Sequence, residues 1–130
     1  MFLKQLSIFI ENRVGALTDA TGILADKGID IRAFSIADTN DFGIMRIIVD
    51  DCDLAADVLK ANGYVVNITT VISVETDNKP GSFHNVLNLL SEAGVFVEYG
   101  YAFVSPNAGK AQFILKVSDD KAAEKALAQV

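Results

Sequence analysis

Leu6 to Ile31 reads LSIFIENRVGALTDATGILADKGIDI, and Ile72 to Val97 reads ISVETDNKPGSFHNVLNLLSEAGVFV. The two stretches match in order at an offset of 66 residues, which pairs Gly15 with Gly81. We extend this offset to three pairs further along the chain: Gly43 with Gly109, Ile48 with Ile114 and Asp53 with Asp119. An offset that holds along most of the chain indicates a duplicated unit.

Each copy of the unit shows the same sequence of patterns. Apolar residues at alternate positions predict a strand, and apolar residues at helical spacing follow. An Asn-x-x-Gly turn separates the two elements, and Gly28 or Gly94 ends the helix. Two further strands follow, joined by a polar loop, and then a second helix whose N-cap we assign to Asp53 or Asp119. A final strand, Tyr64 to Thr70, completes the first copy.

This order predicts an α+β fold made of two ferredoxin-like βαββαβ repeats, each an antiparallel sheet with its helices on one face. We expect the first repeat at residues 1–70 and the second at residues 71–130. After the last helix of the second repeat, no residues remain for its fourth strand. Either the chain is truncated there, or one edge of that sheet lacks a neighbour and favours a partner.

Composition and charge argue against several classes of protein. The net charge is −6, and the 11 Lys and Arg residues form no cluster, which disfavours nucleic-acid binding. The apolar segments are too short to cross a membrane, and the N-terminus lacks the pattern of a signal peptide. We therefore expect a cytoplasmic protein that binds neither nucleic acid nor membrane.

No catalytic or metal-binding constellation stands out in the sequence. His84 is the only histidine and Cys52 the only cysteine, so a zinc site of the usual kind is not available. Asp50, Asp51 and Asp53 lack the calcium-loop pattern, and we interpret them as a strand end and a helix cap. Neither a phosphate-binding glycine loop nor a nucleophile elbow occurs. We expect no enzyme activity, no metal and no cofactor.

The repeated Asn-x-x-Gly turn has two compatible interpretations. In the structural one, Asn12 and Asn78 cap the helices, Pro80 occupies a first helical turn, and the glycines permit close approach of the backbone. In the functional one, an open helix N-terminus beside an amide side chain suits the charged groups of a zwitterion. The sequence leaves both interpretations open.

The turn, its helix and the Gly-Ile-Asp-Ile at 28–31 resemble the opening of an ACT domain, a small regulatory module attached to many enzymes of amino-acid metabolism. Residues 78–83 and 94–97 resemble it again, so the resemblance covers nearly the whole chain. It implies two units side by side, with their sheets joined into one larger sheet and an amino acid bound at the seam. The implied ligand-binding residues lie in both turns and on both second strands: Asn12, Arg13, Val14, Gly15, Ala16, Asp30, Asn78, Lys79, Pro80, Gly81, Ser82 and Phe96.

The two copies depart from each other at two of these positions. Val14 in the first copy stands where the second has Pro80, and Asp30 stands where the second has Phe96. The serine-binding version of the domain has Asn at the position of Asp30. Asp30 can pair with the ammonium of a ligand, whereas Phe96 can only line a side-chain pocket. We therefore expect two sites that are not equivalent.

The resemblance implies a stand-alone regulatory protein that binds a free amino acid and catalyses nothing. We expect a homodimer, because the incomplete second sheet and the high apolar content both favour a partner. The main alternative is a ligand-free interaction module that regulates a separate enzyme of amino-acid metabolism. A small enzyme on the same scaffold is disfavoured by the lack of paired acids, nucleophile–base pairs and metal clusters.

Overall fold

The computed structural model describes residues 2–38 and 42–130 of the chain. Its elements repeat the predicted order β-α-β-β-α, and the closing strand of the first repeat continues into the second as β4. No strand follows α4 among these residues. The middle of the polar loop predicted between β2 and β3 lies outside them. The elements are β1 (Phe2–Glu11), α1 (Ala16–Asp26), β2 (Ile31–Asp38), β3 (Phe42–Val49), α2 (Cys52–Ala61), β4 (Val66–Asp77), α3 (Ser82–Glu92), β5 (Val97–Val104), β6 (Lys110–Val117) and α4 (Asp120–Ala126).

Two compact units divide the chain, and each is described by itself. The first unit is Lys4–Thr69, and the second is Thr70–Val130 together with the first residues of β1. The strand order is β2-β3-β1-β4 in the first unit, while in the second β4 is followed by β6 and then β5. β4 therefore has β1 on one side and β6 on the other.

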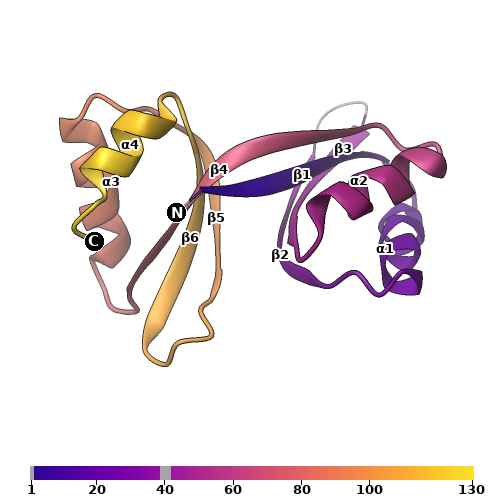
Figure 1. The fold of residues 1–130 in the computed structure, drawn as a ribbon, viewed down its shortest axis with the longest axis horizontal. Coiled ribbons are helices and arrows are strands. Elements are labelled where there is room, and N and C mark those ends of the chain that lie inside the picture. The colour runs from indigo at the N-terminus through magenta and orange to yellow at the C-terminus, as the bar shows by residue number, and fades with distance from the viewer. Residues whose placement is uncertain (1, 39–41) are drawn as a thin grey trace. The chain divides into compact units, whose positions relative to one another are not determined.

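The first unit places α1 and α2 on one face of its strands (Figure 1). β1 and β3 are antiparallel, with Leu6 opposite Ile47 and Glu11 opposite Phe42, and β3 also pairs with β2. Because side chains alternate along a strand, every second residue of β1 and β3 faces the helices. Those residues pack with the small and apolar face of the helices into one core: Leu6, Ile8, Ile10, Ala16, Ala20, Leu24, Met45, Ile47, Val49, Ala55, Ala56 and Leu59.

The second unit repeats this arrangement with α3 and α4. β4 and β6 are antiparallel, with Asp77 opposite Lys110, and β5 pairs with β6 so that Val97 lies opposite Val117. Its core again consists of alternate strand residues and one face of each helix: Ile72, Val74, Val86, Leu90, Val95, Leu115, Val117, Ala123 and Leu127. Within the described chain, no helix is long and apolar enough to cross a membrane.

The offset between the copies changes within the repeat, which corrects the constant offset predicted from the sequence. Cys52 begins α2, and Asp120, which lies 68 residues later, begins α4. The strand register gives the same offset of 68. Phe42 pairs with Glu11 at the end of β1, and Lys110 pairs with Asp77 at the end of β4. The connection before β6 is two residues longer than the one before β3. The predicted pairs of Gly43 with Gly109, Ile48 with Ile114 and Asp53 with Asp119 are therefore wrong.

The helix caps follow the corrected offset. Asp51, not Asp53, caps α2, because its side chain accepts a hydrogen bond from the Leu54 N–H at 3.1 Å. Asp119 caps α4 in the same way, as predicted. Asp53 lies in the first turn of α2, where its carboxylate forms an ion pair with Lys4 at 3.3 Å.

Candidate functional site

The turn between β1 and α1 is built around a glycine in the left-handed region. Gly15 has φ 87°, and the Ala16 N–H behind it donates to the Arg13 carbonyl at 3.3 Å. Gly81, with φ 88°, forms the same turn before α3. A residue with a Cβ is strained in this conformation, so the turn requires glycine in both copies.

Neither helix that follows these turns carries a side-chain cap, which corrects the capping role predicted for Asn12 and Asn78. The N-cap position is the glycine itself, and each asparagine lies three residues earlier. Pro80 likewise lies before its helix and not in the first helical turn. The tight turn around the glycine moves the start of each helix away from these side chains.

The N-terminus of α1 is therefore open. Its first helical hydrogen bond runs from the Asp19 N–H to the Gly15 carbonyl at 2.9 Å. The N–H groups of Leu17 and Thr18 have no acceptor within the described part of the chain, as is usual for a first turn without a cap. Such N–H groups, at the positive end of the helix dipole, suit a carboxylate.

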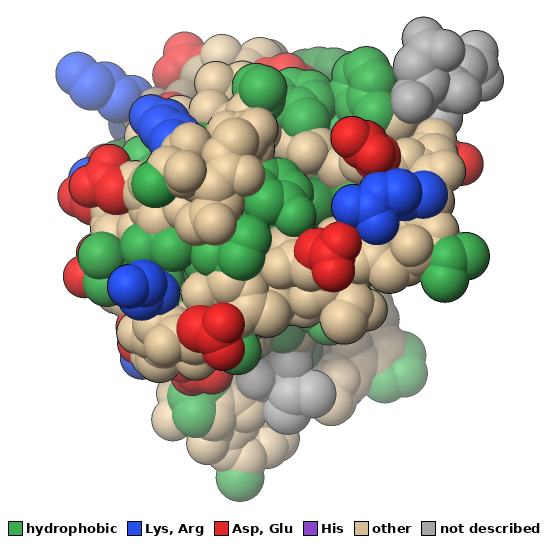
Figure 2. Space-filling model, turned by 90° about the vertical axis from the view of Figure 1, so that its right-hand side faces the viewer, with side chains coloured by type: hydrophobic (Ala, Val, Ile, Leu, Met, Phe, Trp, Pro, Cys, Tyr) green, Lys and Arg blue, Asp and Glu red, His purple; other side chains and the backbone are tan. Residues whose placement is uncertain are grey.

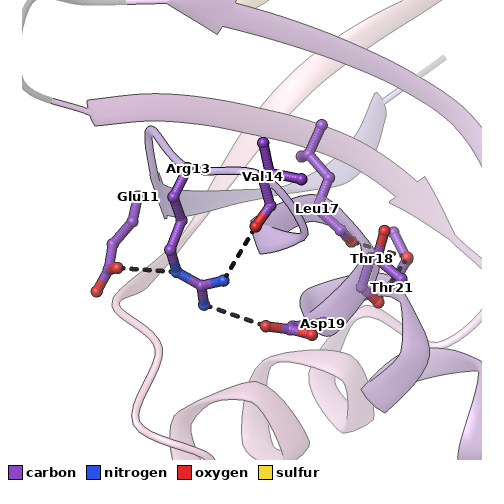
Figure 3. Close-up of polar contacts among 7 residues, drawn as sticks. All are labelled: Glu11, Arg13, Val14, Leu17, Thr18, Asp19 and Thr21. Atoms are coloured by element: carbon purple, nitrogen blue, oxygen red, sulfur yellow. Dashed lines mark hydrogen bonds and ion pairs between the residues drawn. The ribbon is translucent and has the colours of Figure 1, made fainter.

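Arg13 holds this turn against the helix (Figure 3). Its guanidinium donates from Nε to Glu11 Oε2 at 3.1 Å and from Nη2 to Asp19 Oδ2 at 3.1 Å. The hydrogen bonds to Asp19 and then Glu11 raise the pKa of Arg13 above its ordinary value. Val14, between these anchors, is fully exposed. The positive charge of Arg13 is thus already shared between two carboxylates.

A cavity of about 200 Å³ lies between this turn, α1 and the strands, and we name it the α1 pocket. Asn12, Arg13 and Ala16 of the predicted site line it, whereas Val14 and Gly15 do not. Glu11 joins them at the polar end. The remaining lining residues are almost all apolar and were missed from the sequence: Ile10, Leu17, Ile36, Gly43, Ile44 and Met45.

Gly43 lies beside Asn12 in the lining of this pocket. A Cβ placed on Gly43 would lie 3.4 Å from Asn12 Oδ1 and 3.6 Å from the Ala37 carbonyl oxygen. Both are ordinary van der Waals distances, so the Asn12 amide lies next to β3 without requiring glycine at this position. In the sequence Gly43 matches Gly109 of the duplicated pattern, so its contact with Asn12 is not predictable from the sequence.

The second copy fills the equivalent place with aromatic rings. Leu17 corresponds to Phe83 at the offset of 66, and Met45 corresponds to Phe113 at the offset of 68 that holds for β3 and β6. The rings of Phe83 and Phe113 pack with their centroids 4.8 Å apart. The two copies therefore differ in shape at this position.

The predicted residues of the second turn contribute to a different hollow. Lys79 and Ser82 line a cavity of about 310 Å³ with charged walls, which Asn78, Pro80 and Gly81 do not line. There Lys110 Nζ donates to Asp77 Oδ1 at 2.6 Å, a contact that lowers the pKa of Asp77 and raises that of Lys110.

Glu75, also in the wall of this cavity, holds the loop between β5 and β6. It accepts hydrogen bonds from Ser105 Oγ at 2.6 Å and from Asn107 Nδ2 at 2.9 Å. These bonds stabilise the charged carboxylate and lower its pKa, with Ser105 the larger cause. The first copy has Phe9 in place of Glu75, and its ring packs edge-on against Phe42 with centroids 5.3 Å apart.

Asp30 and Phe96 lie one residue before their strands and away from the turns. The Asp30 N–H donates to Asp50 Oδ1 at 3.2 Å, and the Phe96 N–H donates to Ser118 Oγ at 3.0 Å. Asp30 sits at the Val49 end of β3, whereas the turn sits at the Phe42 end. At ~3.3 Å per residue these ends are about 23 Å apart. A single unit does not bring Asp30 and its own turn together.

The two residues that could suggest chemistry have ordinary surroundings. His84 is exposed in the first turn of α3, as predicted. Cys52 is partly buried, and burial followed by the charge of Asp53 raises the pKa of its thiol, which disfavours the reactive thiolate. Among the residues the structure describes, no group of His, Cys, Asp and Glu side chains could hold a metal ion.

Comparison with known proteins places this fold. A crystal structure of a protein from Bacteroides thetaiotaomicron is 43% identical, has a TM-score of 0.92, and is matched over 99% of this chain and 88% of its own. The ligand-free regulatory subunit of aspartate kinase from Thermus thermophilus is 16% identical, with a TM-score of 0.69 over 97% of this chain and 90% of its own. That second match shows the fold alone. No curated protein matches the chain.

The family model described as an ACT domain pair matches residues 1–129. This match spans nearly the whole chain, and the turns, helices and strands described above lie within it. The resemblance inferred from the two glycine turns is thus confirmed. The chain belongs to the ACT domain pair family.

Proposed function

We propose that this chain is a regulatory protein that binds a free amino acid at the α1 pocket and has no catalytic activity of its own. The observation that carries the proposal is the open N-terminus of α1 beside that pocket. The Leu17 and Thr18 N–H groups offer two donors to the ligand carboxylate. Glu11, on the pocket wall, supplies the negative charge that an ammonium group needs.

The other predicted site residues have supporting roles in this proposal. Arg13 fixes the turn through Glu11 and Asp19, and Gly15 gives the turn its shape. Because Asp30 lies at the far end of its own sheet, it can join the site only from another ACT unit. The second turn, with Asn78 to Ser82 and with Phe96, is proposed as a counterpart that is not equivalent to the first.

We also propose that the protein forms a homodimer through β2. In the first unit β2 is an edge strand, and Phe34 and Ile36 on it are 58% and 51% exposed. Exposed apolar side chains on a strand edge favour pairing with another chain. Light scattering on the purified protein tests this, with Phe34→Glu as the variant expected to shift the mass toward the monomer.

The regulated partner is proposed to be a separate enzyme of amino-acid metabolism in the cytoplasm. ACT domains are regulatory rather than catalytic in related proteins, and the fold match includes a regulatory subunit of aspartate kinase. A ligand-free interaction module remains the alternative, and it predicts no response to any amino acid.

Thermal unfolding in the presence of each of the twenty amino acids separates the two. A ligand at 100 times its Kd should stabilise the fold by about 2.7 kcal/mol, which is a clear rise in Tm. If no amino acid raises the Tm, and isothermal titration also detects no heat of binding, the amino-acid proposal is wrong and the interaction module is favoured.

A further inference from the structure

The walls of the α1 pocket limit the kind of ligand side chain that it can hold. Its charged groups, Glu11 and Arg13, lie at the turn, which is the end proposed above for the charged backbone groups of a ligand. The far wall is made by Leu17, Ile36 and Met45. A polar ligand side chain pointing there would lose its hydrogen bonds to water and gain none.

The same three residues also line a neighbouring apolar hollow of about 400 Å³, which continues along α1 to Ile31 and Phe34. Thr21 is its only polar side chain, and the Thr21 hydroxyl already donates to the Leu17 carbonyl at 2.8 Å. The space beyond the α1 pocket is therefore apolar and lacks the charged groups that the pocket has at the turn. It has room for an aliphatic chain but offers no group to orient a polar one.

The second copy has different side chains at the positions where the apolar hollow meets the α1 pocket. Phe83 and Phe113 replace Leu17 and Met45, and their rings lie against each other at an interplanar angle of 35°. Two aromatic rings occupy more volume than the two aliphatic side chains that they replace, and ring packing of this kind is itself favourable. The pair closes the second copy to a ligand side chain.

We propose that the chain binds one amino acid with an aliphatic side chain, of the valine, leucine, isoleucine or methionine type, in the first copy and none at the equivalent place in the second. This inference rests on the proposed function and adds the ligand class and the stoichiometry. The aliphatic chain enters between Leu17 and Met45, and the Phe83–Phe113 pair excludes it from the second copy.

Isothermal titration on the full chain tests both parts with two mirror-image variants. Wild type should bind one aliphatic amino acid per chain and bind serine and aspartate about tenfold more weakly or worse. L17F/M45F, which copies the second unit into the first, should lose binding. F83L/F113M, which copies the first unit into the second, should gain a second equivalent of ligand. Each variant contains only side-chain pairs that the chain already accommodates.

A second measurement does not depend on a variant that adds side-chain volume to the core. Met45 is one of two methionines, so a protein labelled in its methionine methyl groups gives two signals, and Met45→Leu assigns them. Aliphatic ligand should shift the Met45 signal of wild type. This readout keeps the proposal testable if L17F/M45F fails to fold.

The outcomes separate the inference from the function on which it rests. Wild type that binds no amino acid overturns the proposed function. Wild type that binds a polar amino acid best, binds two equivalents, or leaves the Met45 signal unmoved overturns this inference alone. Full binding by L17F/M45F, or no second equivalent in F83L/F113M, overturns the role assigned to the aromatic pair.

Discussion

Lys110 donates a hydrogen bond to Asp77 at 2.6 Å across β4 and β6, where the first copy has Phe42 opposite Glu11. The same strand pairing thus carries an ion pair in one unit and an aromatic–acid pair in the other. The Glu11 carboxylate forms an ion pair with Arg13 instead. The two carboxyl groups with lowered pKa values, Glu75 and Asp77, therefore both lie in the second unit, although the folds match.

The first prediction concerns pH. The pKa values of Asp77 and Glu75 are lowered in the folded state, so the unfolded chain binds more protons in acid. Their stabilisation is present above the ordinary carboxyl pKa of about 4 and is lost as the pH falls through the lower folded values. Urea unfolding at pH 7 and at about pH 3 should show this loss in wild type and a smaller loss in E75Q/D77N. An equal loss in both proteins would contradict the prediction.

The second prediction compares two glycines of the same segment. Gly15→Ala should destabilise the fold by roughly 1 kcal/mol or more, because alanine is strained at φ 87°. Gly22→Ala, inside α1 with nothing within 4 Å of the added Cβ, should stabilise it by about 0.5–1 kcal/mol. Chemical denaturation of both variants beside wild type measures the two changes in the free energy of unfolding. If both changes have the same sign, the turn does not have the conformation described.

The third prediction tests the corrected offset. Asp51→Ala should cost about 1 kcal/mol because it removes the cap of α2, and Asp119→Ala should do the same for α4. Asp53→Ala removes only an exposed ion pair with Lys4 and should change stability much less. The constant offset of 66 predicts the reverse order for Asp51 and Asp53, so unfolding free energies for the three variants decide between them.

The offset of 66 relates β1, α1 and β2 to their counterparts but changes to 68 from β3 onward. Element order, the glycine turns and the left-handed Gly28 and Gly94 were predictable, because periodicity and backbone conformation are local properties. The longer connection before β6 was hidden, because Gly43 and Gly109 match by chance at an offset of 66. Only strand register, which depends on residues distant in the chain, reveals that Gly43 corresponds to Ala111.

The candidate site was predictable only at its polar end. Asn12, Arg13 and Ala16 belong to a motif that is continuous in sequence, and they do line the α1 pocket. Ile36 and Met45 come from other strands and were indistinguishable from core residues in the sequence. The open helix end was also obscured, because an asparagine before a helix ordinarily suggests a cap.

The last prediction addresses the N–H donors directly. Thr18→Pro removes one N–H group that has no acceptor in the described chain, so no helical hydrogen bond of α1 is lost. If a ligand carboxylate uses that donor, amino-acid affinity should fall about tenfold or more, the equivalent of ~1.4 kcal/mol. His84→Pro is the matched control, because His84 holds the same position in α3, and it should leave the affinity unchanged while imposing the same backbone restriction. Circular dichroism verifies that both variants keep their helices. Equal affinities for Thr18→Pro and His84→Pro would mean that the carboxylate is held elsewhere.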